Sequence, residues 1–265
     1  MWSNRLHEAK AWIRHIADAK GPHGVHSPFV YDLITNVLRS KKRNALYAAI
    51  EAERNRLKYC NDELEVIDYG VGSRLHAGSR RTVRSIARAA LQPASHAHAL
   101  TLIASPSRNV LELGTSLGIT TAHLAAALPH SAVYTIEGSD AIAEQARQVW
   151  HKLNLTTIES IVGDFDSVLN QVLNRMKTVD CLIIDGNHSG DACLRYLEMA
   201  IPFSNENTVV IIDDIYWSPS MTEAWMRLVD DDRFSLSLDF FDFGLLYFKR
   251  GRVKEHFVLK RPWVW

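Results

Sequence analysis

Residues 110–118, Val-Leu-Glu-Leu-Gly-Thr-Ser-Leu-Gly, combine a carboxylate with a glycine-rich turn. Gly114, Ser116 and Gly118 have the spacing G-x-S-x-G, which in many hydrolases presents a nucleophilic serine between a strand and a helix. The same spacing also suits a turn whose small residues let the backbone approach a bound nucleotide closely. Glu112 precedes the turn within an apolar run, where a hydrolase has no evident need for a charge.

A second acidic residue separates these two interpretations. Glu137 ends the run AVYTIE about twenty residues beyond the turn, where an acid can accept both hydroxyls of a ribose. A hydrolase would instead recruit Asp213 and His256, but no H-G-G-G-type oxyanion loop occurs upstream. Nucleotide binding is therefore favoured, with Ser116 as a small turn residue. A nicotinamide cofactor stays an alternative, although the chain has Ile119 at the position of the third glycine in the dinucleotide-binding motif G-x-G-x-x-G.

A further group of polar side chains follows two later apolar runs. CLIIDGNHSG places Asp185 and His188 after one run, and VVIIDDIYWS places Asp213 and Asp214 after the next. In an open α/β sheet, ligands bind at the carboxyl ends of the strands, so these residues are expected to converge. Close carboxylates raise one another's pKa, and a hard cation such as Mg²⁺ relieves that repulsion. Alternatively, Asp213 and Asp214 cap the following helix.

The elements that must position these residues follow from the apolar spacing after Pro106. The apolar runs are NVLELG, AVYTIEG, TIESIVG, VDCLIIDG and TVVIIDD. Helices are predicted between them at residues 119–127, 140–153, 165–176 and 191–200. Strands that alternate with helices predict a parallel sheet covered on both faces. Two final runs, FSLSLDFF and GLLYFKR, are separated by only Asp242-Phe243 and predict an antiparallel hairpin.

The first part of the chain has mainly helical patterns. These lie at residues 4–19, 28–39 and 44–60, with a less regular one from Arg80 into the 90s, and Ser27-Pro28 has the form of a helix start. An N-terminal helical extension over 1–105 and a core domain over 106–265 are therefore predicted. The segment 66–81 is interpreted as a loop, either over a site or simply solvated.

The motifs taken together resemble those of class I S-adenosylmethionine (SAM)-dependent methyltransferases. VLELGTSLGITTAHLA followed by VYTIEGSD is similar to the first two motifs of that family. The resemblance implies an α/β Rossmann-like methyltransferase fold, with a seven-stranded, mostly parallel sheet and an antiparallel last strand. It also implies that Glu112 orients the amino-acid end of SAM. The turn expected under the methionine and ribose consists of Gly114, Thr115, Ser116 and Gly118.

The resemblance assigns the rest of the cofactor site to the next two strand ends. Glu137, followed by Gly138, would hold the ribose hydroxyls. IVGDF resembles the segment that lines the adenine, with Asp164 near the exocyclic amine and Phe165 beside the ring.

The later carboxylates are similar to those of metal-dependent O-methyltransferases of the catechol and caffeoyl-CoA types. Asp185 and Asp213 match two metal ligands of these enzymes, and Asp214 replaces an asparagine. His188 stands where they carry a lysine base, and an imidazole can accept a hydroxyl proton near neutral pH. Asp185 is also assigned to catalysis and cofactor binding. An acid at this strand end is common in methyltransferases without a metal, so Asp185 alone does not indicate a metal site.

These resemblances predict a SAM-dependent methyltransferase that O-methylates a small molecule, with Mg²⁺ as a candidate second cofactor. A metal-independent N-methyltransferase and a non-catalytic cofactor-binding protein are the alternatives. The series HGVHSPF, DYGVGS, LELGTSLG, IEG, DGNH and DDIYWS also resembles a little-described group of bacterial methyltransferase-like proteins, which implies no known substrate.

Composition limits the classes of partner that the protein is expected to bind. Thirty basic residues balance thirty acidic ones, so nucleic acid is not expected, although Arg74, Arg80, Arg81 and Arg84 could form a local basic patch. No apolar run reaches the length of about eighteen residues typical of a membrane span, so no membrane partner is expected. Three cysteines without C-x-x-C spacing fit a cytoplasmic protein. Related folds often dimerise through helices, so a homodimer is compatible with the sequence.

Overall fold

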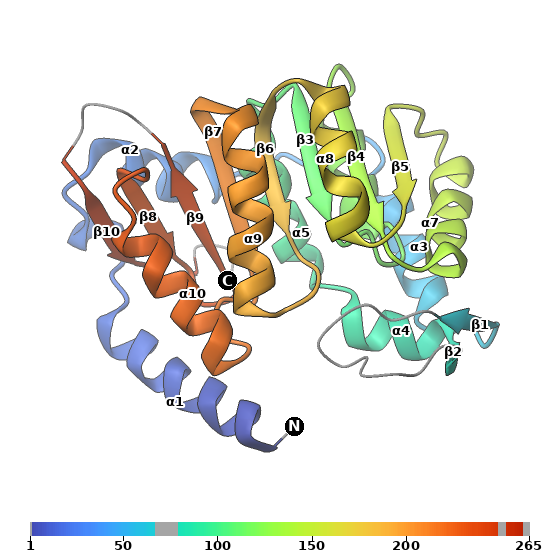
Figure 1. Cartoon of the computed structure of the whole chain (residues 1–265), viewed down its shortest axis with the longest axis horizontal. Coiled ribbons are helices and arrows are strands. Elements are labelled where there is room, and N and C mark those ends of the chain that lie inside the picture. The colour runs from blue at the N-terminus through green and yellow to red at the C-terminus, as the bar shows by residue number, and fades with distance from the viewer. Residues whose placement is uncertain (1, 67–78, 249–252, 262–265) are drawn as a thin grey trace. The chain divides into compact units, whose positions relative to one another are not determined.

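The computed structural model describes residues 2–66, 79–248 and 253–261 (Figure 1). Most of the segment 66–81, including Arg74 and His76, lies outside the described residues. The chain divides into two compact units: unit 1 comprises Met1–Ser40 with Leu173–Trp265, and unit 2 comprises Lys41–Val172. This division differs from the predicted boundary after residue 105, which stays a prediction.

Unit 2 contains three parallel strands in the order β3-β4-β5: β3 (Asn109–Leu113), β4 (Ala132–Glu137) and β5 (Ile158–Val162). α6 (Ile119–Ala127) joins β3 to β4, and α7 (Asp140–Lys152) joins β4 to β5. α8 (Phe165–Met176) follows β5. The predicted alternation of strand and helix is confirmed here, because each apolar run forms a strand.

The rest of unit 2 precedes β3. It consists of α3 (Tyr47–Leu57), the antiparallel pair β1 (Glu63–Val66) and β2 (Ser79–Thr82), α4 (Val83–Ala90) and α5 (Ala94–Ala104). The helix predicted from Arg80 is wrong at its start, because residues 80–82 belong to β2. The Thr82 side chain accepts a hydrogen bond of 3.2 Å from the Ser85 amide, and this N-cap fixes the helix start at Val83.

Unit 1 contains five strands in the order β10-β8-β9-β7-β6: β6 (Val179–Ile184), β7 (Ser204–Asp213), β8 (Leu236–Asp239), β9 (Phe243–Tyr247) and β10 (Glu255–Val258). β6 and β7 are parallel, and β9 is antiparallel to both β7 and β8. The predicted hairpin and reversed strand are therefore confirmed. β10, parallel to β8, is an additional strand beyond the seven predicted ones.

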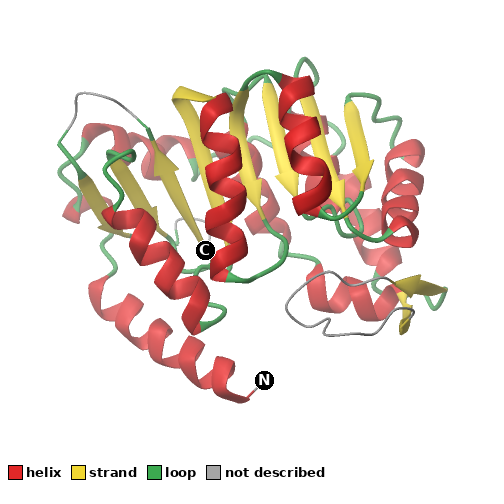
Figure 2. Ribbon diagram, viewed as in Figure 1, coloured by secondary structure: helices red, strands yellow, loops and turns green. Residues whose placement is uncertain are grey.

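Helices cover both faces of the unit 1 strands. α9 (Gly190–Ala200) and α10 (Pro219–Asp230) lie in front of them in Figure 2, whereas α2 (Pro28–Asp32) lies behind. α2 continues as a wider π-helical turn (Leu33–Val37), so the helix predicted over 28–39 is irregular at its end. Short 3₁₀ turns occupy Pro22–Gly24 and Ile201–Phe203, and α1 spans Trp2–Asp18.

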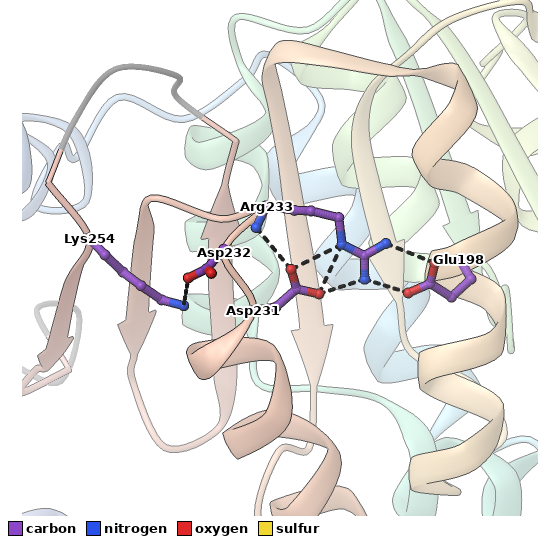
Figure 3. A network of polar contacts seen from close by, with 5 residues as sticks. All are labelled: Glu198, Asp231, Asp232, Arg233 and Lys254. Carbon is purple, nitrogen blue, oxygen red and sulfur yellow. Dashed lines mark hydrogen bonds and ion pairs between the residues drawn. The ribbon is translucent and has the colours of Figure 1, made fainter.

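An ion-pair network joins three segments of unit 1 (Figure 3). The Arg233 guanidinium donates to Glu198 on α9 at 2.5 and 2.8 Å and to Asp231 beyond α10 at 2.5 to 3.0 Å. Lys254 lies 3.5 Å from Asp232. These side chains are mostly exposed, so the network fastens loop ends rather than the core.

Candidate active site

The turn between β3 and α6 has a backbone that only particular residues adopt. Gly114 and Gly118 have φ values of +110° and +73°, and Ser116 has +48°. The Trp150 indole donates a 2.8 Å hydrogen bond to the Gly118 carbonyl. A Cβ atom on Gly118 would lie 2.7 Å from both the indole nitrogen and the Ala146 side chain, so this position requires glycine.

Glu137, at the end of β4, holds this turn in place. Its Oε2 accepts a hydrogen bond from the Ser116 amide at 2.9 Å, and its Oε1 accepts one from the Ser139 amide at 3.0 Å. Gly138 lies between Glu137 and Ser139 in the chain. The hydroxyls of Ser116 and Ser139 are buried and have no hydrogen-bond partner among the described residues. The donor and acceptor groups around Glu137 thus fit a ligand that carries hydroxyls or other polar groups.

The end of β5 adjoins the same place. The Gly163 amide donates a 2.9 Å hydrogen bond to the Glu137 carbonyl. Asp164 immediately precedes α8, and its carboxylate accepts a hydrogen bond from the Ser167 hydroxyl at 2.9 Å. Phe165 is half-buried. The three strand ends that the sequence predicted as a cofactor site therefore lie together in unit 2.

Glu112 lies inside β3, almost fully buried. One of its oxygens accepts the hydroxyls of Thr121 at 2.5 Å and Thr135 at 2.7 Å. Because the Thr135 proton is used there, Thr115, at 2.6 Å, donates to the Thr135 oxygen. Burial raises the pKa of Glu112 to about 7, although the two threonines oppose the shift. Through these threonines Glu112 stabilises the turn between β3 and α6. Its contact with the cofactor stays a prediction.

The second group of predicted residues lies at strand ends of unit 1. Asp185 follows β6, and His188 Nε2 is 3.8 Å from Asp214 Oδ2, just after β7. The His188 and Trp217 rings are 6.1 Å apart. Asn187 and Asp214 both have left-handed backbones, a conformation that these two residue types tolerate well.

Negative charge is concentrated around Asp214. Burial, together with the smaller effects of the nearby carboxylates of Asp213, Glu8 and Asp242, raises its pKa to about 8. Burial lowers the pKa of His188, and Asp213 opposes that shift. A positive charge arriving beside Asp214, whether on an imidazole or on a metal ion, would relieve this repulsion.

Asp185, Asp213 and Asp214 are the predicted ligands of a magnesium ion. Within residues 2–66, 79–248 and 253–261, no three His, Cys, Asp or Glu side chains are arranged to hold a metal ion. Asp185, Asp213 and Asp214 therefore do not form a ready-made metal site in this geometry, and metal assistance stays a prediction.

Other residues contribute to these strand ends without a clear sequence signal. Ser139 supplies an amide to Glu137, and Trp150 supports the turn from α7. Tyr216 donates a 2.5 Å hydrogen bond to Asp239 and stacks on Phe241. Trp217 is about half exposed beside His188.

Residues 111–215 match the family model described as a methyltransferase domain. These residues are less than half of the chain, and they contain both groups of strand-end residues described above. The sheet has the Rossmann-like fold of methyltransferases, with β9, which lies beyond residue 215, as its reversed strand.

Several solved structures are similar to this chain in fold. The SAH-bound methyltransferase PaMTH1 from Podospora anserina is 13% identical, with a TM-score of 0.59 over 85% of this chain and 97% of that chain. The O-methyltransferase from Bacillus cereus in complex with SAH is 24% identical, with a TM-score of 0.52 over 60% and 82%. TomG from Streptomyces achromogenes is an O-methyltransferase involved in tomaymycin synthesis, and its structure contains SAM. It is 21% identical, with a TM-score of 0.52 over 60% of this chain and 82% of that chain.

At these identities the likeness shows the fold. No curated protein matches the chain in sequence. Among the helices that the structure describes, none combines the length and apolar character needed to cross a membrane.

Proposed function

We propose that the chain binds SAM at the ends of β3, β4 and β5 and transfers its methyl group to a hydroxyl of a small molecule. The observation that carries this proposal is the Glu137 carboxylate, which two amides hold beside two buried serine hydroxyls. An acid fixed in this way is prepared to accept the hydroxyls of a ribose, because its orientation costs nothing on binding.

The other residues of unit 2 suit the remaining parts of SAM. The turn from Gly114 to Gly118 would lie under the methionine and ribose, since its small residues let the backbone come close. Asp164 and Phe165 would receive the adenine. That B. cereus O-methyltransferase and TomG were solved with SAH and SAM supports this choice of cofactor.

The reaction needs an aligned acceptor and a place for its proton. SAM supplies an electrophilic methyl group on a sulfonium, so positioning carries much of the catalysis. His188 would accept the hydroxyl proton, and the resulting imidazolium would lie beside the carboxylate cluster, 3.8 Å from Asp214. Asp185 would help to position the acceptor or the cofactor at the end of β6. Mg²⁺ is not needed for any of these steps.

Calorimetric titration with SAM tests the cofactor half of the proposal. We expect the wild-type protein to bind SAM and Glu137→Gln to bind at least about tenfold more weakly, because hydrogen bonds to a charged group contribute about 1.5–3 kcal/mol. Glu144→Gln, which changes an exposed glutamate on α7, should bind as the wild type does. Absence of SAM binding by the wild-type protein would overturn the proposal.

A panel of small hydroxyl and amine acceptors, assayed with and without EDTA, tests the acceptor half. Methylation of hydroxyls supports the proposal, and loss of activity with EDTA would establish the metal that the sequence predicts. Exclusive methylation of amines would support the N-methyltransferase alternative. Retained SAM binding without turnover on any acceptor would favour a non-catalytic cofactor-binding protein.

A further inference from the structure

The outward face of α1 is apolar. Leu6, Ile13 and Ile16 are 59%, 69% and 54% exposed. Together with the exposed Ala9 they recur at spacings of three and four residues, so they form one stripe along the helix. We call these four residues the α1 stripe. A stripe of this kind in a globular protein usually faces the core, and here it faces outward.

The inward face of α1 is polar instead. His7 forms a 2.8 Å hydrogen bond with Thr222 of α10, alongside which α1 runs at the edge of unit 1 in Figure 1. His15 lies 3.2 Å from Asp239 and 3.2 Å from the Leu259 carbonyl. The helix is therefore docked through polar contacts, and its apolar side is not used for packing within unit 1.

Aromatic contacts fix the rotation of the helix. The Trp12 ring meets Phe241 edge to face, with centroids 4.6 Å apart, and the Arg261 guanidinium lies 4.6 Å from the Trp12 ring centre. Together with the His15 contacts, these hold the α1 stripe toward the outside. The exposure of the stripe is thus a consequence of specific contacts and not of a loosely placed helix.

Basic residues border the α1 stripe on both sides. At 100° per residue, Arg5 lies about 20° beyond one edge of the stripe and Lys10 about 40° beyond the other, with Arg14 farther round on the Lys10 side. Of the acidic residues of the helix, Asp18 lies opposite the stripe, and Glu8 lies beyond Arg5, about 80° from the edge of the stripe. An apolar stripe with basic borders is complementary to a surface that is apolar inside and negatively charged at its boundary.

We propose that the α1 stripe docks on an anionic lipid bilayer. Leu6, Ile13 and Ile16 enter the boundary between headgroups and acyl chains, while the bordering basic side chains reach the lipid phosphates. A second copy of this chain fits less well, because the charged residue nearest the stripe on each side, Arg5 or Lys10, is basic and would meet the same charge on a partner. The helix lies on the membrane and does not cross it, in agreement with the absence of a spanning helix among the described residues.

Co-sedimentation with vesicles tests this proposal. Vesicles that contain phosphatidylglycerol should retain the wild-type protein at low salt, and pure phosphatidylcholine vesicles should retain at least about fivefold less, because each basic residue near an anionic surface contributes about 1 kcal/mol. The double variant Ile13→Ser/Ile16→Ser should lower partitioning at least about tenfold through lost apolar burial. Val253→Ser is the matched control, since Val253 is an apolar residue, 85% exposed, outside the stripe.

The possible outcomes are distinct. Unchanged binding of the double variant, or equal binding to both kinds of vesicle, overturns the proposal. A dimer that sedimentation shows without lipid, and that the double variant dissociates, identifies a second copy as the occupant and also overturns it. SAM binding and thermal unfolding of each variant serve as folding controls, and vesicle binding does not depend on the proposed methyl transfer.

Discussion

The two groups of strand-end residues differ in how their polar atoms are satisfied. In β3 and at the end of β4, both carboxylates accept hydrogen bonds. Glu137 accepts them from two backbone amides, and Glu112 accepts them from two threonine hydroxyls. After β6 and β7, burial and neighbouring carboxylates raise the pKa of Asp214 to about 8, and His188 Nε2 lies 3.8 Å from Asp214 Oδ2. The first group is arranged before any ligand arrives, whereas the second brings like charges close together.

This difference matches two kinds of task. A cofactor always presents the same hydroxyls and charges, so a rigid backbone can be fitted to it. A reaction moves protons and charge, so a site for it gains from groups whose charge state changes easily. Substitutions in the first group should therefore act on stability and SAM affinity, and those in the second on turnover.

The largest expected effect is on turnover. His188→Gln should lower kcat about 100-fold or more, since a general base contributes about 10²–10⁴ in rate, and should leave SAM affinity within about twofold. Steady-state kinetics on an accepted hydroxyl substrate and calorimetry measure the two quantities. His130→Gln, at an exposed histidine, is the control. A variant that turns over normally would remove His188 from the mechanism.

A substitution in the turn between β3 and α6 should change stability, not turnover alone. Gly118→Ala should lower the free energy of unfolding by about 3 kcal/mol, because its Cβ would meet Trp150 and Ala146 at 2.7 Å and its φ is +73°. Urea unfolding measures this loss. Gly21→Ala is the matched control, since a Cβ there meets nothing within 4 Å. Equal effects of the two substitutions would contradict the rigid turn.

Glu112 should make stability depend on pH. Its folded pKa of about 7 lies above the ordinary value of 4.5, so the folded state binds more protons between these pH values. The contribution of Glu112 is therefore full below about pH 4.5 and is lost as the pH rises through about 7. Relative to wild type, Glu112→Gln should gain about 2 kcal/mol between pH 5 and pH 8.

Urea unfolding at several pH values measures this difference. Glu159→Gln, at an exposed position on β5, should show the same pH profile as the wild-type protein. If the Glu112→Gln and wild-type profiles run parallel, the carboxyl does not titrate in this range.

The smallest effect is expected away from both groups. Arg233→Gln should cost about 0.5–1 kcal/mol in unfolding free energy, because exposed ion pairs contribute little even when one guanidinium binds two carboxylates (Figure 3). Arg227→Gln removes a single exposed pair with Glu223 and should cost less. A loss at Arg233 as large as that at Gly118 would show that the network supports more than loop ends.

Local patterns predicted most of the fold. All seven expected strands are present because each apolar run is long enough to be buried, and α6 and α8 have the predicted bounds. β10 has only four residues and little alternation, and residues 80–82 pair with β1 although their composition is polar. Both depend on a partner strand that a local pattern does not show.

The site was predictable where a residue type is tied to a backbone position. Gly118 and Glu137 are of this kind, because a left-handed turn and an acidic strand end have few substitutes. Trp150 resembles any apolar residue on the inner face of a helix, and the partner of Tyr216 lies 23 residues away. The α1 stripe has the spacing of a core face, and only its exposure in the structure reveals that it faces outward.

The Trp150 indole has one more use. Its N–H is bonded to the Gly118 carbonyl, and its ring fills the place where a side chain on Gly118 would be. Any movement of the turn therefore changes both the polarity and the packing around a fluorophore. The fluorescence of Trp150 should therefore change when a ligand binds at the turn. The difference in emission between the wild-type protein and Trp150→Phe separates the signal of Trp150 from that of the other tryptophans.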